Sequence, residues 1–546
     1  MDRRTFLQVA AGTAAATLLP TTLSGRAGAQ EVDGPFPYGV ASGDPLADRL
    51  VIWTRVTPTA EAVPGSGLGP DTEVDWEVAR DAGFADRVAH GTETARADRD
   101  HTVKVDVGDL PAGTELWYRF SALGATSPVG RGRTAPAPGQ PVDRLRFGLV
   151  SCSNLEGGFF SAYRHLAGRH DLDAVFHLGD YIYEYGNGGY GGANGRLHDP
   201  PNEIVTLEDY RRRHACYKAD PDLAALHQRC AWVVTIDDHE VANDAWADGA
   251  QNHQPGEGAY SDRKVASRQA WFEWMPVREP DEGDPQRLYR TNGYSDLVDL
   301  FVLDERSYRS QQPAGLSDAL FVTSPVAAEP DRTMLGTAQR TWFEEQLTAS
   351  EAPWKLVLNS VMFAPLVLTD LPDLPTVTPL LQQVLGGLGV SLPVVINGDQ
   401  WDGYQVEQRT MVQRYAESSG VVLLTGDIHS SWGAEIPLDP GTYLPAVKGP
   451  SAAVEFVVPA VTSDSFSAAV ADLGVPGADQ LGPLLPTVVG AAAPWFAYLD
   501  AERHGFGVLE VTPAQVEHQW FYVTDRLDAA AGLVPGPAFR SPAGSN

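Results

Sequence analysis

Five apolar segments of this 546-residue chain each run directly into residues that can bind metal ions. Strands that are apolar on both faces are typical of a covered sheet, and the carboxyl ends of parallel strands share one edge of such a sheet. We therefore expect the residues after these strands to meet in one cleft. Their anionic groups would repel one another without cations, so the cleft is predicted to hold metal ions. These residues are Cys152 after 145–150, Asp180 and Tyr183 after 174–178, Asp238 and His239 after 232–236, Asn359 after 355–358, and Asp427 and His429 after 421–424.

The strand pattern changes near residue 140, and this change predicts two folded parts. Over 30–139 apolar and polar residues alternate in short segments, which is typical of an antiparallel sandwich. Beyond this point the apolar strands are separated by helical segments such as 261–274 and 337–347. We therefore predict an α+β multidomain chain, with a fibronectin-like or immunoglobulin-like β-sandwich over 30–139 and a layered α/β/β/α domain over 140–526. Residues 527–546, rich in Pro, Gly and Ala, are predicted to be a flexible tail or a cap.

The first 29 residues predict an export signal. Arg3 and Arg4 precede a mildly apolar run, and Ala27-Gly28-Ala29 supplies the small residues of a cleavage site, as in twin-arginine signals. Export by the twin-arginine machinery would make the mature protein secreted, periplasmic or cell-wall associated. This route carries folded proteins, commonly with a cofactor inserted, so it also favours a cofactor. No internal segment reaches the ~18 apolar residues of a membrane span, so no integral membrane segment is expected after cleavage.

Charge excludes one large class of partners. Acidic side chains outnumber basic ones by 71 to 40, which gives a formal net charge of −31. A field of this sign repels nucleic acid and anionic membranes. We therefore expect no stable nucleic-acid binding.

The three cysteines allow two interpretations. Cys216 and Cys230 could form a disulfide and leave Cys152 for another role, or all three could be buried free thiols. In either case Cys152 is available as a thiolate ligand, and metal binding would explain why it does not form a disulfide.

Four motifs follow one another in the order Ser151-Cys152, Gly179-Asp180-x-x-Tyr183, Asp237-Asp238-His239-Glu240 and Gly426-Asp427-x-His429. In this order they resemble the calcineurin-type metallophosphoesterases, which are related to purple acid phosphatases, and specifically the PhoD-like alkaline phosphatases and phosphodiesterases. Residues 38–45 also resemble the N-terminal sandwich of that family. The resemblance covers almost the whole mature chain. It implies a secreted phosphoric ester hydrolase with a metallophosphoesterase catalytic domain, one Fe(III) ion and one or two Ca2+ ions.

The resemblance also implies roles for residues at matching positions. One set of ligands would bind iron, one residue would bridge iron and calcium, and oxygen donors would bind calcium. One histidine would contact the substrate or its leaving group. These residues are Cys152, Tyr183 and His429 for iron, Asp180 as the bridge, Asp238 and Asp427 with Asn359 as a weaker candidate for calcium, His239 as the catalytic residue, and Asn243 for holding phosphate or metal.

The donor chemistry agrees with this assignment. A thiolate, a phenolate, a carboxylate and an imidazole offset the high charge of a ferric ion, whereas oxygen-only donors suit calcium. Two cations that share Asp180 would lie roughly 3.5–4 Å apart, a span that fits a phosphoryl group. A metal-bound hydroxide would attack phosphorus in line. His239 would then stabilise the phosphoryl group or protonate the leaving oxygen.

The substrate class stays open at this point. Small phosphate monoesters are the first expectation, and diesters, including phosphodiester polymers, use the same residues. Two apolar insertions, 365–395 and 470–499, are expected to pack as extra core or lids. Alternatively they form an apolar rim for a lipid tail, which would give a phospholipase D-like enzyme acting on phospholipids. A third interpretation, an inactive secreted binding protein, is disfavoured because every ligand position is filled. The segments 303–306 and 399–404 are expected to serve packing or support of the ligands.

Overall fold

The computed structural model describes residues 34–192, 194–280, 284–315, 320–370, 373–375, 377–443 and 450–544. Within these ranges the strands form four sheets, of nine, seven, five and three strands. The predicted export signal over residues 1–29 lies outside the described residues. A search of the described helices finds none with the length and apolar character of a membrane span.

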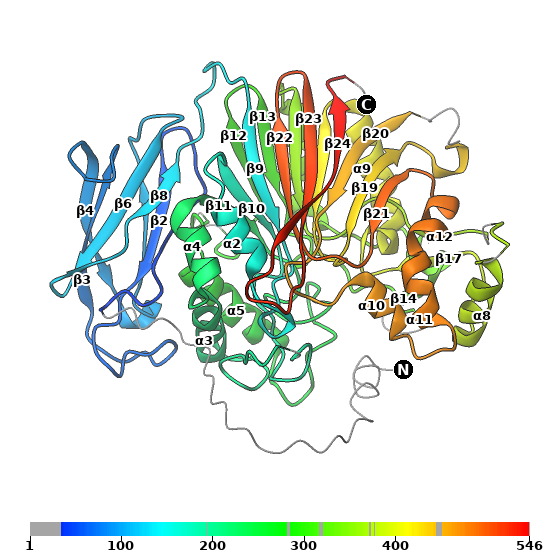
Figure 1. Ribbon diagram of the computed structural model, residues 1–546, viewed down its shortest axis with the longest axis horizontal. Helices are drawn as coiled ribbons and strands as arrows, with labels where there is room; N and C mark the ends of the chain where they lie inside the picture. Colours follow the sequence, from blue (N-terminus) through cyan, green and yellow to red (C-terminus); the bar gives the residue numbers. More distant parts are fainter. Residues whose placement is uncertain are drawn as a thin grey trace.

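The nine-stranded sheet joins both ends of the chain to its middle (Figure 1). Its strand order is β24-β23-β22-β9-β10-β11-β1-β2-β5. The central strands β9, β10 and β11 run parallel, so their carboxyl ends lie at one edge. The bounds are β1 Val40–Gly43, β2 Leu50–Arg55, β5 Thr102–Val107, β9 Leu145–Val150, β10 Ala174–Leu178, β11 Ala231–Thr235, β22 Gly505–Val511, β23 Gln515–Val523 and β24 Leu533–Pro542.

The seven-stranded sheet has the order β12-β13-β15-β18-β20-β19-β21. Its strands β13, β15, β18 and β20 also run parallel, which places a second set of carboxyl ends at one edge. The bounds are β12 Arg290–Tyr294, β13 Val298–Val302, β15 Trp354–Asn359, β18 Val421–Thr425, β19 Ser431–Pro437, β20 Ser451–Val457 and β21 Phe496–Asp500.

The two large sheets share one hydrophobic core. Phe147 of β9, Leu356 of β15 and Leu424 of β18 are fully buried members of the same cluster. Helices α2 and α4 add side chains to it, whereas α7 and α9 pack in a second cluster with Val357 and Leu423 of the seven-stranded sheet. The helices are α2 Ser161–Ala167, α3 Leu207–Lys218, α4 Pro221–Arg229, α5 Tyr260–Trp274, α7 Gly336–Ala349 and α9 Gln405–Glu417.

The N-terminal strands do not form a unit separate from the rest of the chain. The five-stranded sheet packs through Val74 and Phe120 against Ile52 of β2, which belongs to the nine-stranded sheet. Strand β1 pairs in parallel with β11, with Ser42 opposite Ala231. Local alternation predicts the strands but not this pairing, because a partner so distant in sequence leaves no mark on local periodicity. The five strands are β3 Thr72–Ala79, β4 Arg87–Ala95, β6 Glu115–Ala122, β7 Ala125–Thr126 and β8 Gly130–Arg133.

The C-terminal segment differs from the expectation of a flexible tail or a cap. Its residues 533–542 form β24, which pairs antiparallel with β23 at the end of the nine-stranded sheet. The three prolines of this strand, at 535, 537 and 542, are compatible with an edge position, where a missing N–H leaves no neighbouring strand unpaired. The prediction of a flexible tail, which was based on composition, is therefore wrong for residues 533–542, which form an edge strand.

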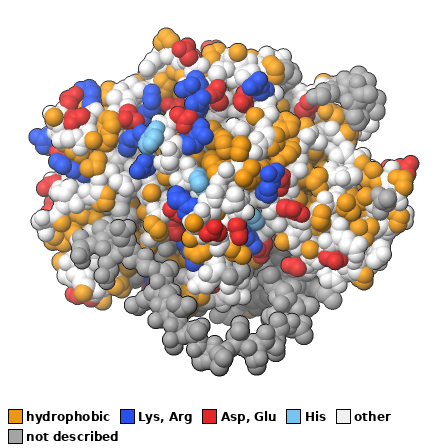
Figure 2. Space-filling view, in the orientation of Figure 1, with side chains coloured by type: hydrophobic (Ala, Val, Ile, Leu, Met, Phe, Trp, Pro, Cys, Tyr) orange, Lys and Arg blue, Asp and Glu red, His pale blue; other side chains and the backbone are white. Residues whose placement is uncertain are grey.

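The two apolar insertions pack against each other at one side of the molecule. Leu381 and Val384 of the first insertion and Leu485 and Val488 of the second belong to one buried cluster. Figure 2 shows apolar side chains gathered on this lobe, at the right of the view. Its elements are β14 Leu320–Thr323, α6 Ser324–Ala327, β16 Val367–Leu368, α8 Thr378–Leu388, β17 Val394–Asn397, α10 Phe466–Ala471, α11 Ala478–Leu481 and α12 Leu485–Ala492.

Candidate metal centre

The carboxyl ends of the two parallel strand groups meet at very short range. A Cβ on Gly426, just after β18, would lie 2.8 Å from the Cβ of Ser151, just after β9. A Cβ on Gly179, just after β10, would lie 2.5 Å from the Cβ of Asp237 after β11. Both distances are too short for any side chain. The glycines of the two Gly-Asp motifs thus let four strand ends converge.

Four residues after the strand ends adopt left-handed backbone conformations. The φ angles are 57° at Cys152, 59° at Asp180, 62° at Asp427 and 51° at His429. This conformation is uncommon for residues with a Cβ and costs about 1–3 kcal/mol each. Strained residues of this kind cluster at functional sites, where the surrounding structure holds them in place.

The first donor group combines sulfur, oxygen and nitrogen. Ligand atoms of Cys152, Asp180 and His429 all lie within 4.8 Å of one another, and Cys152 and Asp180 are buried. The Tyr183 hydroxyl joins them, because it donates to Asp180 Oδ2 at 3.0 Å and lies 3.4 Å from His429 Nε2. The Ser463 hydroxyl lies 2.6 Å from the Tyr183 oxygen. All four predicted residues of this part of the site are thus brought together.

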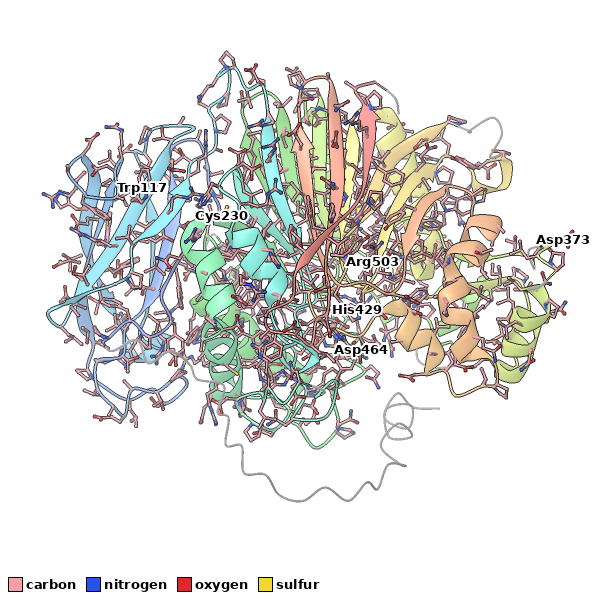
Figure 3. All side chains as sticks on the ribbon, in the orientation of Figure 1. Trp117, Cys230, Asp373, His429, Asp464 and Arg503 are labelled. Atoms are coloured by element: carbon pink, nitrogen blue, oxygen red, sulfur yellow. The ribbon has the colours of Figure 1, made fainter. Side chains whose placement is uncertain are left out.

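The ring of His429 is oriented by its other nitrogen. Nδ1 lies 2.8 Å from the backbone oxygen of Asp464, so it carries the proton and leaves Nε2 as an acceptor. The Asp464 carboxylate is itself held by Arg526, which also donates to the Thr462 carbonyl. Figure 3 places His429 and Asp464 side by side below the strands. A fixed ring with a free Nε2 is the arrangement of a metal-binding histidine.

The second donor group shares Asp180 with the first. Ligand atoms of Asp180, Asp238 and His239 lie within 4.8 Å of one another, and all three residues are buried. The His239 ring stacks on Tyr183 with a 4.2 Å separation of centroids. Because Asp180 belongs to both groups, one carboxylate could bridge two cations.

A third donor group consists of carboxylates only. It contains Asp238, Asp244 and Asp399, again within 4.8 Å of one another. Asp399 is already bound by two arginines, Arg306 at 2.5 Å and Arg309 at 2.6 Å. Asp399 is therefore charge-balanced without a cation.

Arg306 is the central counterion of the site. It is 1% exposed, and its guanidinium lies 2.5 Å from Asp237 Oδ1, 2.5 Å from Asp399 Oδ2 and 3.1 Å from Asp427 Oδ1. Asp427 also accepts a hydrogen bond from Gln400 at 2.8 Å. One guanidinium thus serves three carboxylates, which leaves the site with a negative excess.

The pKa shifts of the side chains in the site reflect this excess of negative charge. Burial, followed by the Asp180 charge, raises the pKa of the Cys152 thiol well above its ordinary value. Burial and the Asp180 charge also raise the pKa of Tyr183. Burial raises the pKa of Asp180, which the neighbouring acids raise further. Burial would lower the pKa of His239, but surrounding carboxylates, with Asp238 first, raise it well above its ordinary value. A bound cation would reverse these trends for the thiol, the phenol and Asp180.

Two buried oxygen atoms fit a cation directly. Among the described residues, Asp238 Oδ1 and Asn359 Oδ1 have no hydrogen-bond partner. A buried polar atom without a partner is costly, and a metal ion would satisfy it. Asn359 stands opposite Thr425 in the β15–β18 pairing, two residues before Asp427. The residues present therefore fit a metal centre with mixed donors around Asp180 and Cys152 and oxygen donors around Asp238.

The predicted residue Asn243 lies beside the site. Its backbone N–H donates to Glu184 Oε1 at 2.8 Å, and its side chain donates to Gln251 at 3.1 Å. The same Glu184 accepts from Asn252 and from the His239 ring. Contact of Asn243 with phosphate or metal stays a prediction.

Sequence reasoning missed several residues of the site. It assigned Arg306 and Asp399 to packing or support of the ligands, and the contacts of Arg306 with three of the site's acids agree with support, but the number of acids that it serves was not predicted. It did not single out Asp244 or Ser463. Arg306 and Asp399 each follow a strand end by a few residues, as the chosen ligands do, and this position was the available signal. Ser463 lies on an irregular loop after β20 and carried no such signal.

Comparison with known proteins places this geometry in a family. The sequence model described as "PhoD-like phosphatase" matches residues 147–520, and the one described as "PhoD-like phosphatase, N-terminal domain" matches residues 22–136. The chain is 38% identical over 453 residues to "Alkaline phosphatase D" of Bacillus subtilis (strain 168), which covers 80% of this chain and 73% of that protein. A solved "Structure of PhoD" matches with a TM-score of 0.78 and 32% identity, over 93% of this chain and 90% of that one.

Proposed function

This chain belongs to the PhoD-like phosphatase family and is a phosphoric ester hydrolase, and we propose that it hydrolyses small phosphate esters at the metal centre described above. The observation that carries the proposal is the sharing of Asp180 between two donor groups. A shared carboxylate suits two neighbouring cations, and paired cations suit phosphoryl transfer. Monoesters are the first expected substrates, and diesters the second.

The donor chemistry supports one Fe(III) ion and one or two Ca2+ ions. Cys152, Tyr183 and His429 would hold iron, Asp180 would bridge, and Asp238, Asp427 and Asn359 would hold calcium. Sulfur, phenolate and imidazole donors suit ferric iron, whereas oxygen donors suit calcium. When bound, these cations would polarise the ester and make a water molecule nucleophilic near neutral pH.

The chain's own residues would orient the ester and move the proton. His239 Nδ1 is held by Glu184, which leaves Nε2 to donate a proton to the leaving oxygen. The Glu184 carboxylate, which is not one of the proposed metal ligands, favours the protonated imidazole that this step needs. Arg306 would keep Asp237 and Asp427 in place while the negatively charged ester enters.

Metal analysis with paired assays tests this proposal. Elemental analysis of the purified protein should find iron and calcium, and chelation should abolish hydrolysis of p-nitrophenyl phosphate, with recovery on adding both ions back. A protein that keeps full activity without metal contradicts the metal-dependent mechanism. Comparing p-nitrophenyl phosphate with bis-p-nitrophenyl phosphate separates monoesters from diesters, and absence of monoesterase activity contradicts the first substrate class.

A second candidate substrate class is a phosphodiester with an apolar tail, such as a phospholipid. A cavity of about 90 Å³ lies between α8 and α10–α12 and is lined by apolar side chains such as Leu381, Leu485 and Phe466. Phe466 follows Asp464, whose backbone orients His429, by two residues. The cavity thus borders a loop of the metal centre. An apolar cavity of this kind takes an alkyl group rather than a charged one.

Filling the cavity tests this candidate. Leu385→Trp should lower kcat/KM for a long-chain phosphodiester and leave kcat/KM for bis-p-nitrophenyl phosphate unchanged. An enlarged side chain at exposed Leu123, on the far N-terminal part, provides the matched control. Equal effects on both substrates contradict a role of the cavity in substrate choice.

Export and the N-terminal part complete the proposal. Arg3, Arg4 and the segment 27–29 support export by the twin-arginine route to a secreted, periplasmic or cell-wall location. The facing strands over residues 40–133 support a fibronectin-like or immunoglobulin-like sandwich, and the two large mixed sheets support an α/β/β/α layering. The domain bounds 30–139 and 140–526 stay predictions. Replacing Arg3 and Arg4 by lysine should block export, as measured by cell fractionation.

A further inference from the structure

A polar cavity, separate from the apolar one between α8 and α10–α12, lies at the opposite end of the parallel strands from the metal centre. Its volume is about 300 Å³, within the usual range for ligand pockets. Arg144 precedes β9, Asp173 precedes β10, and Arg229 precedes β11, and all three line the cavity. Since a five-residue strand spans about 17 Å, the cavity is separate from the metal centre. In Figure 3 the labelled Cys230, another lining residue, lies well away from His429.

The wall of this cavity is rich in arginine although the whole chain is strongly acidic. Four arginines line it, against three acids. Figure 2 shows several Lys and Arg side chains at the upper left of the face, with acidic side chains among them. The Cys230 thiol adds no charge, because burial raises its pKa to about 12.

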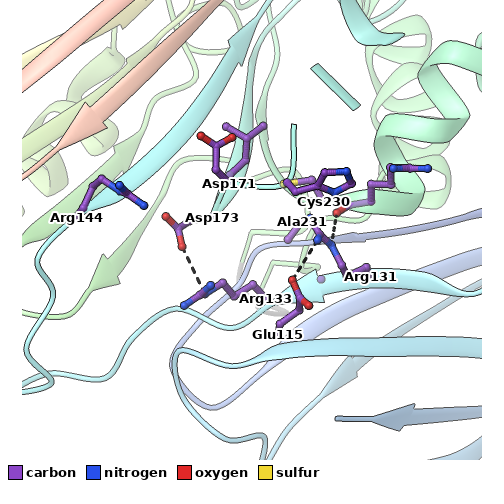
Figure 4. A pocket seen from close by; sticks show the side chains of 12 residues that line it. Glu115, Arg131, Arg133, Arg144, Asp171, Asp173, Cys230 and Ala231 are labelled. Atoms are coloured by element: carbon purple, nitrogen blue, oxygen red, sulfur yellow. Dashed lines mark hydrogen bonds and ion pairs between the residues drawn. The ribbon is translucent and has the colours of Figure 1, made fainter. Parts of the chain in front are cut away.

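The acids of the wall are already engaged. Arg131 lies 3.1 Å from Glu115, and Arg133 lies 3.4 Å from Asp173 (Figure 4). Asp171 is bound from outside the cavity by Arg146 at 2.6 Å. Each carboxylate of the wall therefore has an arginine partner, and none is left unpaired to neutralise the other arginines of the wall.

Two arginines of the wall remain without an ion-pair partner. Among the described residues, neither Arg144 nor Arg229 has a carboxylate within 4.0 Å of its guanidinium. Arg144 is near enough to Asp173 to help lower that acid's pKa, although burial raises it overall. Figure 4 shows Arg144 extending from its strand toward the space beside Asp173 and Arg133. Both residues are exposed, and two guanidinium groups without an ion-pair partner beside an otherwise neutralised wall favour an anion.

We propose that this cavity binds a phosphate-type oxyanion, with Arg144 and Arg229 as its charged contacts. The planar guanidinium fork matches two oxygens of a phosphate group, which makes arginine the preferred side chain for such ligands. The anion can be free phosphate or the phosphate group of a larger ester, since the volume leaves room beyond one phosphate. Because the cavity lies at the amino ends of the strands, an anion bound there would be remote from the metal centre, where hydrolysis is proposed.

Calorimetric titration of the holoenzyme with inorganic phosphate tests this site. We expect two binding equivalents, one at the metal centre and one in the cavity. Arg144→Gln with Arg229→Gln should weaken the second equivalent about tenfold or more, since each lost contact is charge-assisted. Hydrolysis of p-nitrophenyl phosphate by the double variant should keep its kcat/KM, because neither residue contacts the metal centre.

The control is a second pair of exposed arginines. Arg80→Gln with Arg87→Gln removes the same charge from the β3–β4 hairpin, and both equivalents should remain. A single equivalent in the unaltered protein, or a second equivalent that survives the Arg144 and Arg229 changes, overturns the proposal. Dimethyl phosphate distinguishes the sources: binding of both probes indicates a phosphodiester group, and binding of phosphate alone indicates a dianion.

Discussion

His239 Nδ1 lies 2.7 Å from Glu184 Oε2, and both side chains are buried. Glu184 also accepts hydrogen bonds from Asn252 and from the backbone of Asn243. The carboxylate thus keeps a proton on Nδ1 and fixes the direction of the imidazole. Burial would raise the pKa of Glu184, but the His239 charge and the hydrogen bonds lower it overall.

Glu184→Gln is expected to lower kcat about 10- to 100-fold with a smaller change in KM, because His239 loses its orienting partner and one of the carboxylates that raise its pKa. The decline of kcat at high pH should begin at a lower pH than in the wild type. Steady-state kinetics between pH 6 and 10 measure both effects. Glu407→Gln, a buried carboxylate that accepts from the N–H groups of Met334 and Leu335, is the matched control and should leave kcat unchanged. Equal kcat values in the two variants would contradict the orienting role.

Tyr183→Phe is expected to remove a visible absorption band of the purified protein. A phenolate bound to Fe(III) gives a charge-transfer band, and phenylalanine supplies no oxygen donor. Absorption spectroscopy with parallel iron analysis measures the change. Tyr294→Phe is the control, because Tyr294 is equally buried and its hydroxyl has no hydrogen-bond partner among the described residues. A colourless native protein that contains no iron would refute the iron assignment but not the assignment as a phosphoric ester hydrolase.

Arg306→Met is expected to destabilise the metal-free protein by about 3–5 kcal/mol, because Asp237, Asp399 and Asp427 lose their shared counterion. Urea unfolding in chelator measures this loss. Added metal ions should recover part of it, since cations replace the missing charge. Arg414→Met, whose partner Glu417 is on the surface, should change stability by less than about 0.5 kcal/mol. A loss that metal ions do not reduce would contradict a negative excess at the site.

Asp402→Asn is expected to make stability less dependent on pH. Burial raises the pKa of Asp402 to about 7, against hydrogen bonds from Leu366 and Gln408 that lower it. The native state therefore holds a proton that the unfolded state releases above its ordinary pKa, so this group's contribution is full at low pH and is lost as pH rises toward 7. The slope reaches at most about 1.4 kcal/mol per pH unit.

Unfolding of wild type and Asp402→Asn between pH 4 and 8 checks this prediction. The free energy of unfolding of the variant, relative to wild type, should rise with pH across this window. The exposed Asp439 provides the control substitution, Asp439→Asn. A difference between variant and wild type that does not vary with pH would contradict the shift.

Local pattern predicts the strands well and their long-range partners poorly. The predicted strands 145–150 and 174–178 coincide with β9 and β10, because buried parallel strands are apolar along their whole length. The convergence of Cys152, Asp180 and His429 follows from strand ends alone, and the structure brings them together. The role of Arg306 does not follow, because one guanidinium serving three acids depends on loop geometry that no spacing encodes. The edge strand β24 was missed because its prolines and glycine resemble a tail.

The parallel pairing of β1 with β11 has a consequence for dissecting this protein. Cutting the chain near residue 140 would remove β1, β2 and β5 from the nine-stranded sheet and leave the backbone amides of β11 exposed to other molecules. The shorter fragment would keep the pairing of β1 with β2 but lose the pairing of β1 with β11, and the longer one would gain an unpaired edge that favours self-association. The two halves are therefore poor candidates for exchange as independent modules in hybrid enzymes.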